Sequence, residues 1–207
     1  MPTPNIKDNP RGTLTLLRAL VPGRVVSPRE ALQIAELQAV RLRRHLGIDQ
    51  PLFPSDALNL PRIRVQHDAD LPSSGMTFWN GSTWMILLNS TEAVTRQRFS
   101  MLHEFKHVID HTTKHRLYGA TTQRHDPVAE RTADYFAACV LMPKMYVKRH
   151  WGRGPRTLTS MAETFGVSPA AMKYRLDQLG LANEPRRCQW SQKAYRRALH
   201  QTTELAA

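Results

Sequence analysis

The chain has 207 residues, 41% of them hydrophobic, which is enough for one folded domain with a buried core and a short appendage. No apolar run approaches the ~18 residues of a membrane span, no N-terminal apolar stretch predicts a signal peptide, and two cysteines do not support a disulfide framework, so we expect a cytoplasmic protein without membrane association. The net charge of +12, from 29 basic and 17 acidic residues, favours an anionic partner such as nucleic acid or an acidic protein, although it can equally serve solubility.

The N-terminal quarter is expected to hold an arm and one helix. Residues 1–26 contain four prolines and little periodicity, which predicts a loose arm, with a short helix possible near 14–20. The segment Ser27-Pro28-Arg29-Glu30 is a capping box with proline at the first helical position, and Gly47 ends the helix that it begins. The last turns carry three arginines, which we interpret as complementing the helix dipole rather than contacting DNA: Arg41, Arg43 and Arg44.

A small sheet is predicted next, after a proline-rich linker at 51–61. Ile63 and Val65 alternate with polar residues, which indicates a half-exposed strand. The runs 75–79 and 82–88 flank Asn80-Gly81, the dipeptide typical of a hairpin with a type I′ turn. The segment therefore predicts a small antiparallel sheet, whose exposed edge either binds a substrate by strand addition or is purely structural.

The central motif is His103-Glu104-Phe105-Lys106-His107, which has the form H-E-x-x-H. A helix capped at Asn89 and running to about His111 would place both histidines on one face, one turn apart, where they can bind a single Zn²⁺. The carboxylate of Glu104 can then take a proton from the activated water. The alternative is a helix that carries two histidines by chance, in a chain with nine of them.

A second helix is expected to supply the third ligand. Asp126-Pro127 has the pattern of a helix start, and the helix must end before Pro143. Glu130 and Asp134 lie one turn apart on it, so Glu130 is the best candidate ligand and Asp134 can accept a hydrogen bond from a ligating imidazole. Both can equally be ordinary solvated acids. Cys139, in the apolar part of this helix, is most simply a buried small hydrophobe.

Between the two helices lie three residues that can stabilise an oxyanion or can equally be solvated, and the sequence does not choose among them: His115, Tyr118 and His125. His111 does not complete the longer metzincin pattern, which is absent.

The C-terminal part is basic. Residues 143–156 contain no acid and predict a basic loop; residues 158–181 predict two short helices resembling a helix-turn-helix; and the tail 183–207 is basic, either an amphipathic helix or unstructured. Candidate contacts to nucleic acid or a protein partner are Lys144, Lys148, Arg149, Arg153, Lys173 and Arg175.

Three stretches together resemble one family. HEFKHVIDH, AERTADYFAACVLMP and LTSMAETFGVSPAAMKYRLDQLGL, spread over residues 60–181, are similar to the ImmA/IrrE metallopeptidases. The chain has Val140 where many members have leucine, a conservative departure. The resemblance implies an α+β, zincin-like fold, with His103, His107 and Glu130 as zinc ligands and Glu104 as general base. It also implies a bacterial or phage regulatory protease that cleaves a helix-turn-helix transcriptional repressor, in a stress response or in the induction of a mobile element.

We therefore expect a loose arm at 1–26, a zinc metallopeptidase domain at 27–157, a helix-turn-helix-like segment at 158–182 and a basic tail at 183–207. The first functional hypothesis is a zinc-dependent endopeptidase with a protein substrate. The alternative is a DNA-binding regulator, or a toxin–antitoxin-like protein that acts by binding a partner, with a structural or sensory metal. Two histidines and one carboxylate also suit iron, so the ligand set does not by itself select zinc.

Overall fold

The computed structural model describes residues 12–119, 126–153 and 157–181. None of the helices in these ranges combines the length and the apolar character that a membrane span requires. The elements in chain order are α1 (Thr13–Arg18), α2 (Pro28–His45), β1 (Ile63–Asp68), β2 (Gly75–Trp79), β3 (Trp84–Asn89), α3 (Val94–Asp110), α4 (Lys114–Tyr118), α5 (Pro127–Leu141), α6 (Lys144–Trp151), α7 (Leu158–Phe165) and α8 (Pro169–Gln178).

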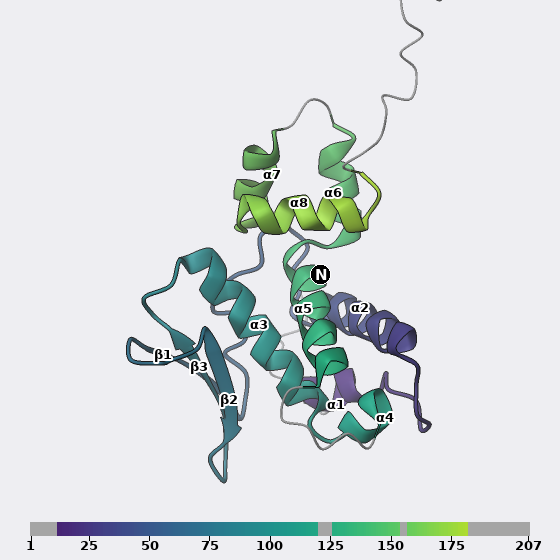
Figure 1. The fold of residues 1–207 in the computed structure, drawn as a ribbon, viewed down its shortest axis with the longest axis vertical. Coiled ribbons are helices and arrows are strands. Elements are labelled where there is room, and N and C mark those ends of the chain that lie inside the picture. The colour runs from purple at the N-terminus through teal and green to yellow at the C-terminus, as the bar shows by residue number, and fades with distance from the viewer. Residues whose placement is uncertain (1–11, 120–125, 154–156, 182–207) are drawn as a thin grey trace, which may run out of the picture.

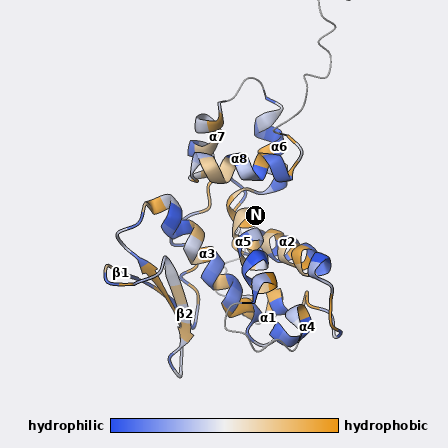
Figure 2. Cartoon of the chain, viewed as in Figure 1, coloured by the Kyte–Doolittle hydropathy of each residue, from blue (hydrophilic) through white to orange (hydrophobic). Residues whose placement is uncertain are grey.

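The elements stack in layers around α5. The sheet packs on one side of α3, α3 packs on α5, and α5 packs on α2 (Figure 1). Helices α6–α8 form a separate group at the C-terminal end of α5. Along α2 hydrophobic and hydrophilic residues interleave (Figure 2), and its apolar stripe faces α5. One hydrophobic core joins these layers to the C-terminal group, since Phe105 of α3, Phe136 of α5 and Phe165 of α7 are all buried in it.

The predicted fold class, α+β with a small sheet beside active-site helices, is confirmed, although the sheet is mixed. Its strand order is β1-β3-β2, with β2 antiparallel and β1 parallel to β3. The expectation of a wholly antiparallel sheet is wrong for β1. The β2–β3 hairpin places β3 in the middle of the sheet, where β3 runs in the same direction as β1. β2 is therefore an edge strand, and it packs on α3.

The hairpin turn also differs from the prediction. Trp79 pairs with Trp84, so the loop has four residues, 80–83. A type I′ turn needs positive φ at both central residues, but here Gly81 has φ 101° and Asn80 does not adopt positive φ. The Asn80 side chain instead accepts hydrogen bonds from the backbone N–H groups of Ser82 and Thr83, at 3.1 and 2.8 Å. This side chain closes the wider loop.

Helices α2 and α5 begin where the sequence signals indicated, whereas α3 does not. Ser27 and Glu30 form the expected capping box of α2. Asp126 caps α5 by accepting from Val128 N at 2.8 Å, and Ser168 caps α8. Helix α3, however, begins after Ala93 without a side-chain cap. The predicted cap Asn89 is instead the last residue of β3. Its side-chain oxygen accepts a hydrogen bond from the Thr91 backbone N–H at 2.9 Å, which forms a turn before the helix begins.

Two segments that were predicted to lack regular structure contain helices. Within the predicted loose arm, residues 13–18 form α1, and Leu17 is completely buried. This is the short helix that the sequence allowed near 14–20, so the described part of the predicted arm, residues 12–26, is not loose. The predicted basic loop is mostly helix, because α6 spans Lys144–Trp151 and buries Tyr146 and Val147. Helices α7 and α8 occur where the helix-turn-helix-like segment was expected, and the basic tail lies outside the described residues. The proposed division into domains stays a prediction.

Candidate metal centre and active site

Packing of α3 against α5 brings three side chains with lone pairs together. His103 and His107 come from α3, and Glu130 comes from the first turn of α5. His103 Nε2 lies 3.1 Å from His107 Nε2 and 3.2 Å from Glu130 Oε2, and His107 Nε2 lies 3.6 Å from Glu130 Oε1. The three groups converge closely enough to hold one metal ion.

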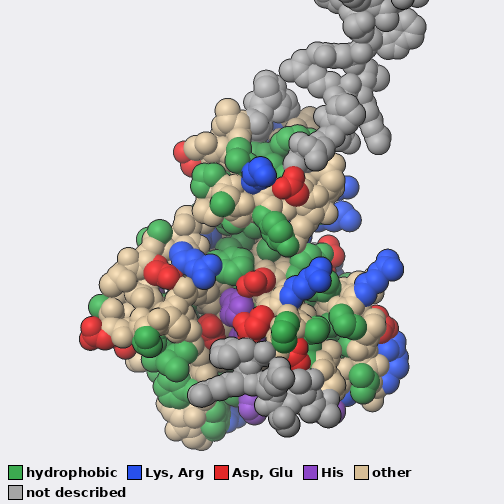
Figure 3. Space-filling model, viewed as in Figure 1, with side chains coloured by type: hydrophobic (Ala, Val, Ile, Leu, Met, Phe, Trp, Pro, Cys, Tyr) green, Lys and Arg blue, Asp and Glu red, His purple; other side chains and the backbone are tan. Residues whose placement is uncertain are grey.

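These distances agree with a small tetrahedral ion. Ligand atoms bound at about 2.0–2.1 Å in a tetrahedron lie about 3.3–3.4 Å apart, and the three observed separations bracket that value. Within the described residues these three groups are the ones that converge, and three protein ligands with an open fourth position are the arrangement of catalytic rather than structural zinc sites. On the face drawn in Figure 3, histidine and acidic side chains lie next to one another near the middle of the molecule.

Burial and neighbouring charges shift the pKa values of the two imidazoles in opposite directions. Burial, followed by the positive charge of His103, lowers the pKa of His107 to about 4, so His107 is neutral at pH 7 and its lone pair is free to bind. Burial opposes charge on His103, but Asp134 Oδ1, which accepts from His103 Nδ1 at 2.8 Å, and nearby Glu104 and Glu130 raise its pKa. Asp134 thereby orients this ring with Nε2 toward Glu130.

Glu104 lies against β2. A Cβ placed on Gly75 would come within 3.1 Å of Glu104 Cγ and 3.4 Å of its Oε1, so any larger residue at this position would push the Glu104 side chain away by a few tenths of an ångström. Burial raises the pKa of Glu104, while the charge of His103 lowers it. The motif signalled Glu104, but no sequence signal singled out Gly75, because the contact joins two elements that are far apart in the chain.

A buried ion pair lies beneath the motif. Lys106 Nζ donates to Asp110 at 2.5 and 2.6 Å, and neither side chain is appreciably exposed. Tyr118 donates its hydroxyl to Asp110 Oδ2 at 2.5 Å; burial and this carboxylate raise the pKa of Tyr118, so the phenol stays protonated. Sequence reasoning missed this group, although the Lys106–Asp110 spacing of one helical turn was a visible signal.

One cavity borders the three convergent residues and a second lies beside Asp134. A small one, of about 180 Å³, is lined by His107 and Glu130 and also by Tyr118, whereas His115 on α4 is exposed. His125, the third candidate for oxyanion stabilisation, lies outside the described residues. A larger one, of about 740 Å³, opens on the other side, beside Asp134.

The predicted contact residues divide into two groups. Five of them are exposed and lie on α6, just after α6, or on α8: Lys144, Lys148, Arg149, Arg153 and Lys173. Those on α6 are separated from Glu130 by most of the length of α5. Arg175 is only 1% exposed, and its Nε donates to Met142 O at 3.1 Å. The prediction of Arg175 as a nucleic-acid or partner contact is therefore wrong, because its side chain binds α8 to the end of α5.

Comparison with known families places residues 62–177 in one peptidase family, described as the IrrE N-terminal-like domain. The chain belongs to this family. The matched segment includes all three convergent residues, Glu104 and Asp134. The resemblance to ImmA/IrrE peptidases stated from the motifs is confirmed, and a metallopeptidase family agrees with a donor set that can hold a metal ion.

Among solved structures, a Mycobacterium tuberculosis transcriptional regulator is similar, with a TM-score of 0.56 at 17% sequence identity. The similarity covers 84% of this chain and 53% of that one, so the present chain spans about half the length of the regulator. At this identity the likeness shows the fold alone. A comparison with curated proteins finds none that matches.

Proposed function

We propose that the chain is a zinc-dependent endopeptidase that cleaves a cytoplasmic helix-turn-helix transcriptional repressor, in a stress response or in the induction of a mobile element. Membership of a peptidase family and a donor set suited to a metal ion support the activity. The fold similarity to a transcriptional regulator, together with the sequence resemblance to repressor-cleaving proteases, supports the substrate class.

The observation that carries the proposal is the position of Glu104. Its Cγ and Oε1 lie 3.1 and 3.4 Å from the position that a Cβ at residue 75 would take, and it neighbours His103 on the same helix. A site that only held a metal for structural reasons would need no such base. The partial burial of Glu104 raises its pKa toward the working pH, as suits a general base.

The residues divide the chemistry among them. His103, His107 and Glu130 would hold the ion, which supplies positive charge that acidifies water and polarises the peptide carbonyl. Glu104 accepts the proton of the attacking water and passes it to the departing amine nitrogen. Asp134 keeps His103 in one tautomer through the 2.8 Å hydrogen bond. Tyr118 lines the neighbouring small cavity, but its single hydroxyl proton is donated to Asp110, so no oxyanion role is assigned to it.

The test is to co-express wild type, Glu104→Gln or Glu163→Gln with a candidate repressor and to follow the intact mass of the repressor. Glu163 is an exposed acid on α7 and serves as the matched control. General-base catalysis contributes about 10²–10⁴-fold, so Glu104→Gln should bind the repressor but barely cut it, while Glu163→Gln cuts like wild type. Equal relief of repression by wild type and Glu104→Gln, with the repressor uncut in both, would refute the protease reading. Metal analysis of the purified chain decides between zinc, manganese and iron.

A second candidate is a regulator that binds DNA or a protein partner. It is favoured by the +12 charge and by the helix pair α7–α8. A DNA mobility shift that persists after metal removal, and that is lost in Lys173→Glu, would support it. Arg175 is excluded as a direct contact because it is buried.

A further inference from the structure

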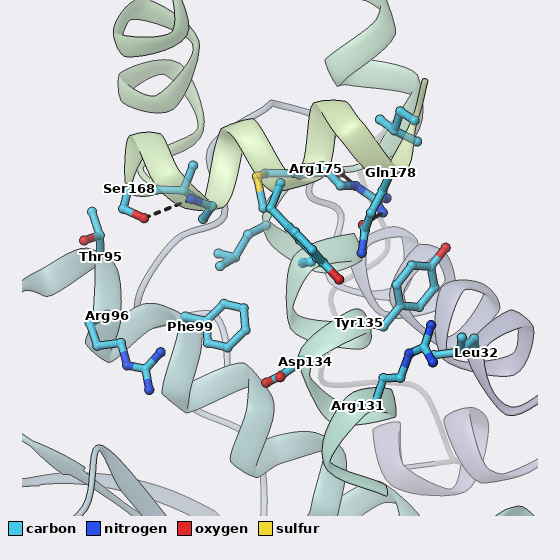
Figure 4. A pocket seen from close by; sticks show the side chains of 17 residues that line it. Leu32, Thr95, Arg96, Phe99, Arg131, Asp134, Tyr135, Ser168, Arg175 and Gln178 are labelled. Atoms are coloured by element: carbon cyan, nitrogen blue, oxygen red, sulfur yellow. Dashed lines mark hydrogen bonds between the residues drawn. The ribbon is translucent and has the colours of Figure 1, made fainter. Parts of the chain in front are cut away.

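The larger cavity has a mainly apolar wall and reaches Phe99 and Asp134, which neighbour His103 of the candidate metal centre. It lies between α3, α5 and α8, and Figure 4 shows Phe99 and Asp134 on its floor with Tyr135 to one side. Asp134 bonds to His103, and the Phe99 ring lies 6.5 Å from the His103 ring. A peptide bond placed at the metal centre would therefore have a neighbouring side chain within reach of this cavity. The apolar lining also includes Ala138, Leu141, Met142, Val167, Ala171 and Leu179.

The charged groups around the cavity are mostly basic. Arg96 extends from α3 and Arg131 from α5 on its two sides (Figure 4). Arg96 makes a loose ion pair with Glu92, 3.8 Å away, and donates to Ser74 Oγ at 3.2 and 3.3 Å. Within the described residues no hydrogen bond or ion pair engages the side chain of Arg131. The lining acid is Asp134, which is already bonded to His103. The rim therefore favours a negatively charged occupant.

This charge distinguishes among possible occupants. The chain's own segment 182–207 follows α8 but carries five basic and two acidic residues, so the two rim arginines repel it. A nucleic acid would match the charge but not the apolar walls. An acidic peptide with one large apolar side chain matches both features.

Resting on the proposed peptidase function, we propose that this cavity is the substrate subsite that selects the cleavage position. It takes a large aliphatic or aromatic side chain next to the scissile bond, and Arg96 and Arg131 bind Asp or Glu residues that flank that side chain. Selection by this subsite restricts cleavage to acidic, locally apolar segments, so the protease spares most cytoplasmic proteins.

The test uses four ten-residue peptides that combine a central Leu or Ala with flanking Glu or Lys residues. Binding is measured by fluorescence anisotropy with the full-length Glu104→Gln chain, and cleavage with metal-loaded wild type. The Leu peptide with Glu flanks should bind best. Replacing Leu by Ala should weaken binding about tenfold or more, since about three buried carbons are lost, and Lys flanks should weaken it about three- to twentyfold at low salt.

Two variants test the subsite itself, each checked for an unchanged thermal melt. Arg131→Glu should reverse the preference for Glu over Lys flanks, whereas Arg64→Glu, an exposed arginine on β1 outside the cavity, should not. Ala171→Trp should fill the cavity and abolish the preference for Leu. If Arg131→Glu folds poorly, Arg96→Glu replaces it.

The possible outcomes separate the two proposals. Equal binding of all four peptides, or the same result from Arg131→Glu and Arg64→Glu, overturns the subsite. Cleavage by wild type but not by Glu104→Gln, without any sequence preference, overturns the subsite and leaves the peptidase proposal standing. Selective binding of the acidic Leu peptide without cleavage supports the cavity as a peptide site and contradicts the peptidase proposal.

Discussion

Arg175 is the residue whose replacement tests the packing of the C-terminal helices most directly. Its guanidinium is buried between α8 and the end of α5, where Nε donates to Met142 O at 3.1 Å and a terminal nitrogen donates to Gln178 at 3.0 Å. It also lies over the Tyr135 ring, 5.6 Å from the centroid. Arg175→Ala removes all of these contacts and leaves a cavity.

The magnitude follows from these contacts. Buried hydrogen bonds from a charged donor contribute about 1.5–3 kcal/mol, and the contact with Tyr135 about 0.5–2 kcal/mol. Against this, burying a guanidinium without a carboxylate partner carries a desolvation cost that the substitution relieves. We expect a net loss of about 2–4 kcal/mol in the free energy of unfolding, which lowers Tm by about 5–15 °C in a chain of this size.

The assay is urea and thermal unfolding of wild type, Arg175→Ala and Lys173→Ala. Lys173 lies on the same helix but is exposed, with an ion pair to Asp177 at 3.8 Å, so its replacement should change stability by less than about 0.5 kcal/mol. Because α8 lines the large cavity, Arg175→Ala should also weaken binding of the acidic Leu peptide. Equal stability of the two variants would refute the structural role of Arg175.

Three further substitutions give independent checks. Asp134→Ala should weaken metal binding by roughly 10–100-fold in a chelator competition, and an unchanged affinity would make Asp134 a surface acid. Gly75→Val should displace Glu104 and lower kcat at least about tenfold with metal content and KM retained; full activity would show that the close approach is dispensable. Asp110→Asn leaves Lys106 buried without its counter-charge and should cost about 3–5 kcal/mol in urea unfolding, most of it recovered when Lys106→Met is added; a neutral effect would contradict the buried pair.

The elements that local interactions specify were predictable from the sequence. The capping box placed the start of α2 and Asp126-Pro127 placed the start of α5, because these signals act within one helical turn. The same helical periodicity put His103 and His107 on one face, and Glu130 and Asp134 on another. The spacing thus indicated which side chains can act together, although their roles at the site stay a proposal.

Only the tertiary structure decided the contacts between elements far apart in the chain. Sequence periodicity does not reveal that β1 runs parallel to β3, because it shows which face of a strand is buried but not which other strand forms hydrogen bonds with it. Nor does it distinguish Arg175 from the exposed Lys173, since burial of a long basic side chain depends on the backbone carbonyl that receives it, here Met142 O. The approach of Gly75 to Glu104 likewise arises because the sheet packs on α3, and no residue near either position in the sequence encodes it.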